Sequence, residues 1–199
     1  MSALEVETAS DGSTRGLGAL LAPLLEPGDV VLLTGGLGAG KTTFVKGVVA
    51  GLGCTQAVTS PTFTLVRTYE SEPVVAHVDC WRLDQLDEVA DLALDEVLDA
   101  GGVALVEWGE AAAPLFGAGA LEIRIDAAGA GEGKRARGAP AHSALQAERV
   151  EASTRDESAR VVALSSRSPS WEHRLARLEA LCRGAGLAVR DSVARGVGP

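Results

Sequence analysis

Gly35-Gly36-Leu37-Gly38-Ala39-Gly40-Lys41-Thr42 is the stretch that decides the fold, and it follows the apolar run Val30-Val31-Leu32-Leu33. A segment compatible with a helix begins at Thr43. Glycines at three positions of the loop let successive backbone N–H groups turn toward one anion without a side-chain clash, and the dipole of the following helix favours the same anion. Strand, loop and helix together predict a phosphate-binding P-loop.

The P-loop pattern assigns roles to two of its residues. Lys41 is expected to reach the β- and γ-phosphates of a nucleotide, and Thr42 to place its hydroxyl on the Mg²⁺ that bridges them. The chain contains no asparagine, so it cannot carry the Asn-Lys-x-Asp motif that selects guanine. The loop itself therefore predicts a nucleotide phosphate bound with Mg²⁺, and a GTPase is less expected.

Composition narrows the class of protein. The formal net charge of −9 argues against a free-standing nucleic-acid binder, because such binding needs a surplus of Lys and Arg to neutralise phosphates. We expect no contact with DNA, and contact with RNA only through partners. Cys54, Cys80 and Cys182 lack the spacing of a disulfide framework or a zinc site, and no apolar run is long enough to span a bilayer. These features predict a cytoplasmic protein that does not enter a membrane.

Two carboxylates are expected at the ends of strands near the P-loop. Glu107 follows the apolar run 103–106, and such a strand beside a P-loop supplies an acidic group for Mg²⁺. Asp79 ends a predicted strand over 74–78, at the edge where open α/β sheets place ligands, although a solvated turn aspartate is the alternative. Trp108 either shields this site or stacks on a partner, and a plain core or rim tryptophan is the alternative.

Hydrophobic periodicity predicts the other elements. We expect helices over 14–25, 43–52, 83–98 and 171–182, a hairpin that includes the strand at 74–78, and further strands over 103–107, 121–125 and 160–164. These elements predict an α/β fold of the P-loop NTPase type, a three-layer sandwich with a mainly parallel central sheet and added antiparallel strands.

The domain organisation follows from a change in composition. Residues 127–157 mix Ala, Gly, Lys, Arg, Pro and Glu without a period, which is typical of a flexible insertion. We expect a P-loop ATPase domain over 1–165 that contains this insertion, and a C-terminal helix with a loose tail over 166–199.

Several motifs follow one another in a specific order. They are Thr14-x-x-Leu17-Gly18, the P-loop through Thr43, Ser60-Pro61-Thr62-Phe63-Thr64-Leu65-Val66, His77-Val78-Asp79-Cys80-Trp81-Arg82-Leu83, Val106-Glu107-Trp108 and Glu157-Ser158-Ala159-Arg160-Val161. In this order, over residues 4–165 less the insertion, the chain resembles the TsaE family, the small P-loop ATPases of bacterial tRNA threonylcarbamoyladenosine (t6A) biosynthesis.

The resemblance implies a function and a set of partners. It implies an ATPase that serves as an accessory subunit to TsaD and TsaB, the enzyme pair that transfers threonylcarbamoyl to adenosine 37 of tRNA. It also implies that this chain contacts tRNA only indirectly, through that complex. The segment Ser60, Pro61, Thr62, Phe63 and Thr64 is similar to the family's switch-like loop, whose position can report the state of the γ-phosphate.

The resemblance also implies individual roles. It places Thr14 near the adenine, the phosphates on the loop from Gly38 to Thr43, and Mg²⁺ on Thr42 and Glu107. Asp79 would support the metal or the attacking water. By the same resemblance, Trp108 flanks the site and Arg160 contacts the nucleotide.

Two features depart from the family pattern. Gly36 stands where the family usually has Asp, which leaves the backbone cradle intact but can alter loop rigidity or a partner contact. The loop before Arg160 is longer than usual, so Arg135 and Arg137 compete with it for the nucleotide. Two other functions stay open, namely a small-molecule P-loop kinase and a nucleotide-gated assembly module with negligible turnover.

Overall fold

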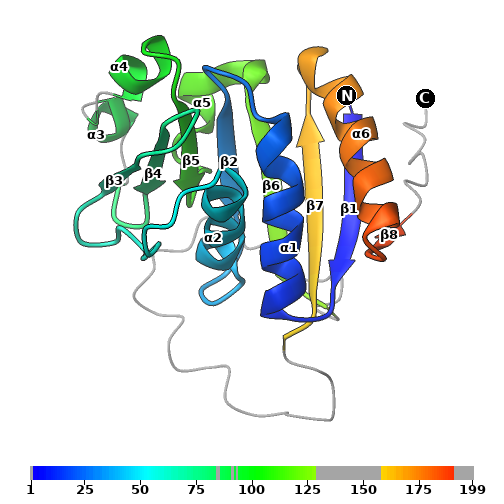
Figure 1. Ribbon diagram of the computed structural model, residues 1–199. Coiled ribbons are helices and arrows are strands. Elements are labelled where there is room, and N and C mark those ends of the chain that lie inside the picture. The colour runs from blue at the N-terminus through cyan, green and yellow to red at the C-terminus, as the bar shows by residue number, and fades with distance from the viewer. Residues whose placement is uncertain (1, 84–85, 91, 93, 129–157, 191–199) are drawn as a thin grey trace, which may run out of the picture.

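A single sheet runs through the part of the chain that the computed structural model describes, which is residues 2–83, 86–90, 92, 94–128 and 158–190 (Figure 1). Its strand order is β3-β4-β5-β2-β6-β7-β1-β8. The four central strands are mutually parallel: β4 (Val75–Asp79), β5 (Val103–Glu107), β2 (Val30–Thr34) and β6 (Leu121–Ala127). The four outer strands are antiparallel to their neighbours: β3 (Val66–Tyr69), β7 (Arg160–Ser166), β1 (Ser2–Thr8) and β8 (Ala188–Arg190). The predicted sheet is therefore confirmed.

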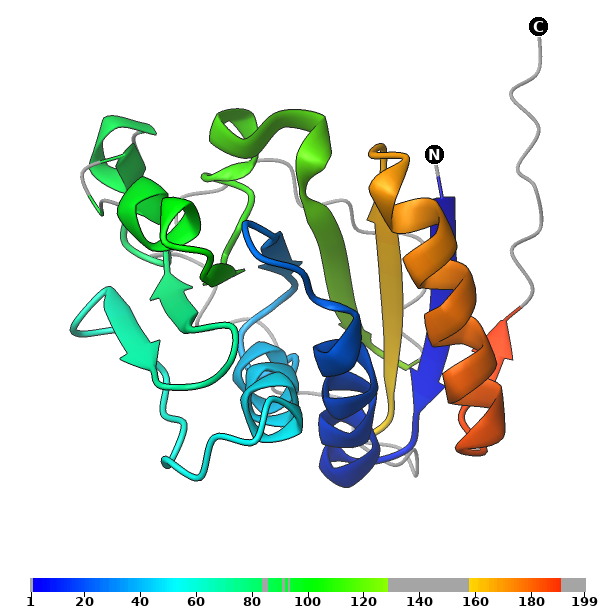
Figure 2. The ribbon, with the colours of Figure 1, turned by 45° about the horizontal axis from the view of Figure 1, so that its top comes forward.

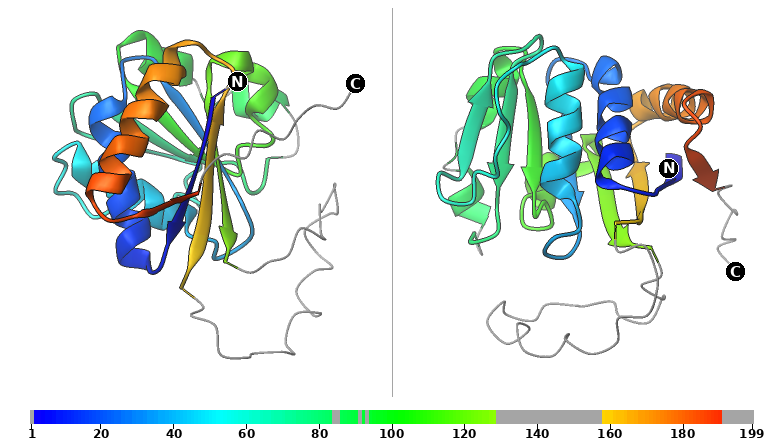
Figure 3. Two further views of the ribbon diagram at one scale, coloured as in Figure 1. Left: turned by 90° about the vertical axis from the view of Figure 1, so that its right-hand side faces the viewer. Right: turned by 60° about the horizontal axis from the view of Figure 1, so that its bottom comes forward.

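Helices cover the sheet in two layers. One face carries α1 (Asp11–Leu21) with the short 3₁₀ turn η1 (Ala22–Leu24), α2 (Lys41–Gly51) and α6 (Ser170–Gly184), as the views in Figures 1 and 3 agree. A second cluster of buried residues joins the opposite faces of β2, β4 and β5 to α3 (Leu86–Ala90), α4 (Leu94–Asp99) and the region of α5 (Ala113–Phe116) with η2 (Gly117–Gly119). The three-layer sandwich predicted from the sequence is present.

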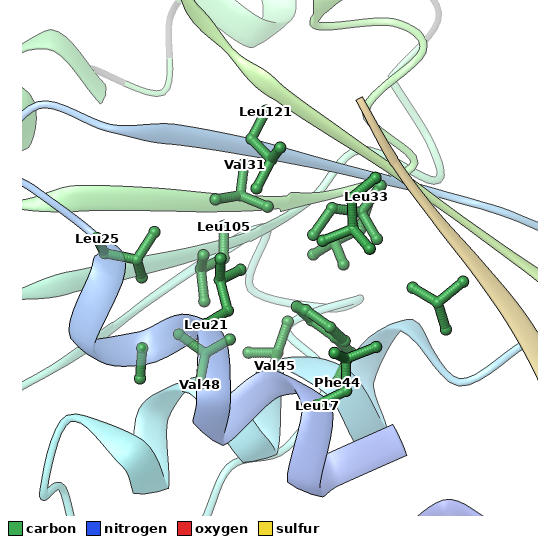
Figure 4. Close-up of a cluster of buried hydrophobic side chains, with 14 of the residues drawn as sticks. Leu17, Leu21, Leu25, Val31, Leu33, Phe44, Val45, Val48, Leu105 and Leu121 are labelled. Atoms are coloured by element: carbon green, nitrogen blue, oxygen red, sulfur yellow. The ribbon is translucent and has the colours of Figure 1, made fainter. Parts of the chain in front are cut away.

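Two glycines bring α1 and α2 into close contact. A Cβ atom built at Gly18 would lie 2.3 Å from the carbonyl oxygen of Phe44, and one at Gly47 would lie 2.0 Å from that of Arg15. Only glycine permits this approach of the two backbones. The contact presses Leu17, Leu21 and Val48, among others, onto β2 and β5 (Figure 4). The core thus fixes α2, which carries the P-loop at its N-terminus.

The structure corrects the helix and strand boundaries near the two ends of the described chain. β1 was not expected, and it pairs with β7 through its full length. Residues Ala188–Arg190, expected in a loose tail, form β8 on the outer edge of β1. The helix before β8 packs beside β1 (Figure 2), and its Arg174 donates to the Asp29 carboxylate ahead of β2 at 2.5 and 3.2 Å.

Other boundaries move by a few residues. The first helix begins at Asp11, where Ser10 and Ser13 form a capping box, and it gives way to η1 after Leu21. The acidic helix expected over 83–98 is two short helices, α3 and α4. β6 extends to Ala127, which is the first residue of the predicted insertion. Residues 129–157, with Arg135 and Arg137, lie outside the described residues.

The division into 1–165 and 166–199 stays a prediction, although α6 and β8 pack on the same sheet as the P-loop. Among the described helices, none combines the length and the apolar character that crossing a bilayer requires.

Candidate functional site

The carboxyl ends of three neighbouring strands place two acids beside the P-loop. In the parallel register, Asp79 of β4 stands opposite Glu107 of β5, and Glu107 stands opposite Leu33 of β2. The P-loop leaves β2 directly after Thr34. Because ligands of open α/β sheets bind at this edge, the predicted acids and the predicted phosphate loop meet where a nucleotide would lie.

The backbone of the P-loop depends on its glycines. Gly40 caps α2 with a φ of 109°, and Gly35 has a φ of 135° with no room for a Cβ atom, which would lie 2.2 Å from the carbonyl oxygen of Ile125. Side chains other than hydrogen are strained in this region of backbone conformation. The loop delivers the first turn of α2, whose N–H groups have no acceptor within the helix and so favour an anion.

Lys41 is buried and turned back onto its own loop. Its Nζ donates to the carbonyl oxygens of Gly35 at 2.8 Å and Gly36 at 3.0 Å, and it lies 3.6 Å from the ring centroid of Trp108. Burial lowers the pKa of the ammonium, while the charges of Glu107 and other nearby carboxylates act in the opposite direction. Within the described residues, Lys41 has carbonyl and aromatic partners and forms no ion pair with a carboxylate, which suits it to accept an anionic ligand.

Glu107 receives two hydrogen bonds on one oxygen. Thr42 Oγ1 lies 2.7 Å from Glu107 Oε1, and His77 Nε2 lies 2.8 Å from the same atom. Glu107 is 3 % exposed and His77 is 0 % exposed. The two residues predicted to bind Mg²⁺ are therefore in direct contact, and a third residue that the sequence analysis left without a role adjoins them.

Asp79 accepts hydrogen bonds from the predicted switch-like loop. Its Oδ2 accepts from Ser60 Oγ at 3.1 Å and from Thr62 Oγ1 at 2.6 Å, and its Oδ1 accepts from the backbone N–H of Trp81 at 2.9 Å. The loop leads into β3 through Leu65, a residue with a φ of 62°. Such a conformation costs a leucine about 1–2 kcal/mol, so the surrounding contacts hold the loop against local strain. These contacts exclude the alternative of a merely solvated Asp79.

Two tryptophans form one wall of the site. The rings of Trp81 and Trp108 lie 4.2 Å apart between centroids at an angle of 54°. Trp108 has a φ of 58°, which turns its ring back over Lys41 directly after the β5 strand. Trp108 thus lines the cavity and also packs, half-buried, against the second cluster of buried residues.

These groups surround a cavity of about 340 Å³. Of the residues singled out from the sequence, the following line it: Gly38, Ala39, Gly40, Lys41, Thr42, Thr43, Ser60, Thr62, Asp79, Glu107 and Trp108. Leu37 and Trp81 also line it and were not proposed as site residues.

Other predicted residues lie near the cavity but not in its lining. Thr14 is buried and shares a 2.7 Å hydrogen bond with Thr8, while Arg160 donates from Nε to the Ala39 carbonyl oxygen at 2.9 Å. Arg160 thus braces the P-loop backbone. Phe63 is 87 % exposed, and the guanidinium of Arg82 lies 5.2 Å from its ring centroid.

Two residues of the site carried a signal in the sequence that was not used. His77 stands two positions before Asp79 on a strand, so strand alternation places both on one face. Trp81 lies two residues after Asp79, the last residue of that strand. It therefore stands at the carboxyl edge of the sheet, where ligands of open α/β sheets bind.

The donor set fits a magnesium nucleotide. Within the described residues, no group of three or more His, Cys, Asp and Glu side chains could hold a metal ion unaided. Mg²⁺ prefers oxygen ligands and is usually held by one or two carboxylates together with waters and phosphate oxygens. The Thr42 hydroxyl and the buried Glu107 carboxylate at the mouth of an anion cradle are such a set.

Comparison with known proteins points the same way. The family model described as threonylcarbamoyl adenosine biosynthesis protein TsaE matches residues 8–136. A curated relative from Bacillus subtilis, named tRNA threonylcarbamoyladenosine biosynthesis protein TsaE, is 42 % identical over 130 residues, which are 65 % of this chain and 81 % of the relative. A protein of the same name from Streptomyces coelicolor is 48 % identical over 118 residues, 57 % of this chain and 79 % of the relative.

A solved structure shares the fold. The crystal structure of Bacillus subtilis YdiB superposes with a TM-score of 0.67 at 28 % sequence identity, and the match covers 90 % of this chain and 96 % of that one. The likeness thus extends beyond the residues that the family model matches.

Proposed function

Because this chain belongs to the TsaE family, whose members take part in tRNA threonylcarbamoyladenosine biosynthesis, we propose that it is a Mg²⁺-dependent ATP hydrolase of that pathway. It acts as an accessory subunit when adenosine 37 of tRNA is modified to t6A. One observation supports this proposal above all: Lys41, Thr42 and Glu107 line the same cavity as the P-loop.

Each group in the cavity has a task in phosphoanhydride hydrolysis. The first-turn amides of α2 hold the phosphate oxygens, and Lys41 exchanges its two backbone carbonyls for the β- and γ-phosphates, where it neutralises negative charge. Mg²⁺, when bound, would supply positive charge against the negative charge that develops on the phosphate oxygens. Thr42 and Glu107 would hold it, and Glu107 keeps the Thr42 hydroxyl hydrogen turned away from the cavity.

Asp79 has the position to orient the attacking water. Its carboxylate lines the cavity one strand away from Glu107. Its Oδ2 accepts hydrogen bonds from Ser60 and Thr62, so this oxygen becomes free for a water when the two hydroxyls move away. We infer that turnover involves a movement of the loop that contains both residues.

The partners follow from the family and from the charge. We propose that TsaD and TsaB carry out the transfer and bind tRNA, since a chain with a net charge of −9 is poorly suited to hold tRNA alone. This chain then contributes nucleotide binding and hydrolysis to the complex.

A second function is favoured by one observation. Asp79, the carboxylate that we propose orients water, is engaged by Ser60, Thr62 and the backbone of Trp81, as it would be in a nucleotide-gated assembly module with negligible turnover. The two functions differ in one quantity, the rate of ATP hydrolysis in the presence of the partners.

The test is ATP hydrolysis by the purified chain with and without TsaB and TsaD. We expect stimulation by the partners, and a loss of at least about 100-fold in Lys41→Ala and Glu107→Ala, because each removes a group aimed at developing charge or its metal. Lys46→Ala, on the same helix but outside the cavity lining, is the matched control and should retain activity.

The outcomes separate the candidates. Retained turnover in Lys41→Ala or Glu107→Ala would refute the assignment of the site. Tight Mg-ATP binding without partner-stimulated hydrolysis would favour the assembly module, and transfer of phosphate to an added metabolite would favour the kinase. Recovery of the t6A transferase subunits in an ATP-dependent pull-down would support the pathway directly.

A further inference from the structure

His77 is a polar ring in an apolar interior. It lies on β4 with 0 % exposure, opposite Leu105 in the register with β5, and its ring centroid is 6.2 Å from that of Tyr69. Burying a polar group is unfavourable unless hydrogen bonds compensate it. Among the described residues, Nδ1 has no hydrogen-bond partner. The hydrogen bond between Nε2 and Glu107 therefore compensates for the burial of this polar ring.

The geometry of that contact defines the state of the ring. A carboxylate only accepts hydrogen bonds, so Nε2 carries a proton and donates it to Glu107 Oε1 over 2.8 Å. Thr42 Oγ1 donates to the same oxygen from the opposite element, the first turn of α2. Neither hydrogen bond reaches Oε2, and Glu107 lines the cavity. Two donors on one oxygen hold the carboxylate in a single orientation.

We propose that His77 is the positioning residue of the magnesium site, acting through Glu107 and not by contact with ligand. This inference rests on the proposed function, because it gives Glu107 its orientation for the metal. Without the Nε2 donor, the Glu107 side chain keeps the Thr42 bond alone and can rotate about it. Loss of such an outer partner typically costs 10- to 100-fold in metal affinity.

Three substitutions distinguish positioning from packing. His77→Gln places an amide N–H where Nε2 stands, whereas His77→Asn is also polar but its shorter amide cannot reach Oε1. His77→Leu removes all donors at similar volume. Val75→Ala, two residues earlier on the same face of β4 and fully buried, is the control for a weakened core that leaves Glu107 untouched.

The measurement is ADP affinity by calorimetry in EDTA and at stepped MgCl₂ concentrations. We expect Leu and Asn variants to need about 10- to 100-fold more Mg²⁺ for the half-maximal gain in affinity, with affinity in EDTA changed less than about twofold. The Gln variant should stay within about threefold of the unsubstituted chain. Even if the Leu variant fails to fold, the difference between the Gln and Asn variants shows whether His77 positions Glu107 or only fills space.

Failures of the two proposals look different. If the unsubstituted chain shows no Mg²⁺ dependence of ADP binding, the proposed function and the role of His77 are both overturned. If it shows the dependence, and Asn and Leu variants shift it no more than Val75→Ala does, the role of His77 alone is overturned. A Gln variant as impaired as the Asn variant would also overturn it.

Discussion

Replacing Asp79 with alanine should release the loop over residues 60–65 from the end of β4. Asp79 Oδ2 accepts hydrogen bonds from Ser60 Oγ at 3.1 Å and Thr62 Oγ1 at 2.6 Å. Alanine removes the acceptor of both. The hydroxyls line the cavity and become solvated, so the cost is the net value of the two hydrogen bonds and not that of two buried, unsatisfied groups.

The size of the effect follows from those two bonds. A hydrogen bond to a charged group contributes about 1.5–3 kcal/mol net, but Ser60 is exposed and Thr62 is half-buried, so water competes for both hydroxyls and lowers the value to about 1 kcal/mol each. Their joint loss then amounts to about 2 kcal/mol. Because about 1.4 kcal/mol is a tenfold change in an equilibrium constant, the open form of the loop should become about 30-fold more populated. Thr62→Val removes one of the two bonds and should give about a fivefold change.

Three backbone amides report on the opening. The N–H groups of Thr64 and Leu65 both donate to the carbonyl of Pro61, and that of Val66 donates to the carbonyl of Thr64. Their hydrogen exchange, measured by NMR in Asp79→Ala, Thr62→Val and the unsubstituted chain, gives the opening free energy directly. The amides of β2 serve as the reference for the whole fold.

Two results would refute the reasoning. Unchanged exchange of the three amides in Asp79→Ala would mean that the carboxylate does not hold the loop. An increase of equal size in β2 would place the loss in the global stability of the chain, since β2 is a central strand and exchanges only when much of the sheet opens.

Two further predictions concern packing and thiol chemistry. Gly47→Ala should lower the free energy of unfolding by about 3 kcal/mol in urea titrations, because its Cβ atom would meet the Arg15 carbonyl oxygen at 2.0 Å, whereas Gly36→Ala, with open space around its Cβ atom, should change it by less than about 1 kcal/mol. Burial, with the charge of Asp79, raises the pKa of the Cys80 thiol to about 11, so at pH 8 about one molecule in a thousand carries the reactive thiolate there. Iodoacetamide should therefore label the half-buried Cys54 of the native chain well before Cys80, and rapid labelling of Cys80 seen by peptide mass spectrometry would contradict the burial.

The parts of the fold that local chemistry determines could be predicted from the sequence. Glycine spacing specifies a P-loop because the phosphate cradle is made of consecutive backbone groups, and it required no knowledge of distant contacts. The order of apolar strands and amphipathic helices was sufficient for the α/β class.

Elements that depend on distant partners were harder to predict. Leu4-Glu5-Val6-Glu7 alternates as a strand should, but its neighbours in the sheet of the described residues, β7 and β8, come more than 150 residues later. β8 has three residues and no periodicity to detect. Such strands form because the edge strand of the folded sheet offers unpaired backbone N–H and C=O groups. The local sequence of the added strand does not reveal that this edge will lie beside it.

The candidate site divides in the same way. Lys41, Thr42 and Glu107 were found through motifs, whereas the contact of His77 with Glu107 depends on the register between β4 and β5. The engagement of Asp79 by Thr62 likewise depends on a tertiary contact across 17 positions. Motifs therefore identified the groups that we propose bind phosphate and metal, and only the fold revealed the contacts that restrain them.

Those restraints bear on how the site can work as a switch. The hydroxyls of Ser60 and Thr62 line the same cavity as Lys41, and a phosphate oxygen there can accept the hydrogen bonds that Asp79 now accepts. A ligand shifts a conformational equilibrium only by the difference in its affinity for the two states. The loop therefore leaves β4 only if its contacts with the phosphate are at least as favourable as the roughly 2 kcal/mol that its hydrogen bonds to Asp79 contribute. A nucleotide that fills the cradle but presents no oxygen to these hydroxyls would bind without moving the loop, which is the property that a γ-phosphate sensor requires.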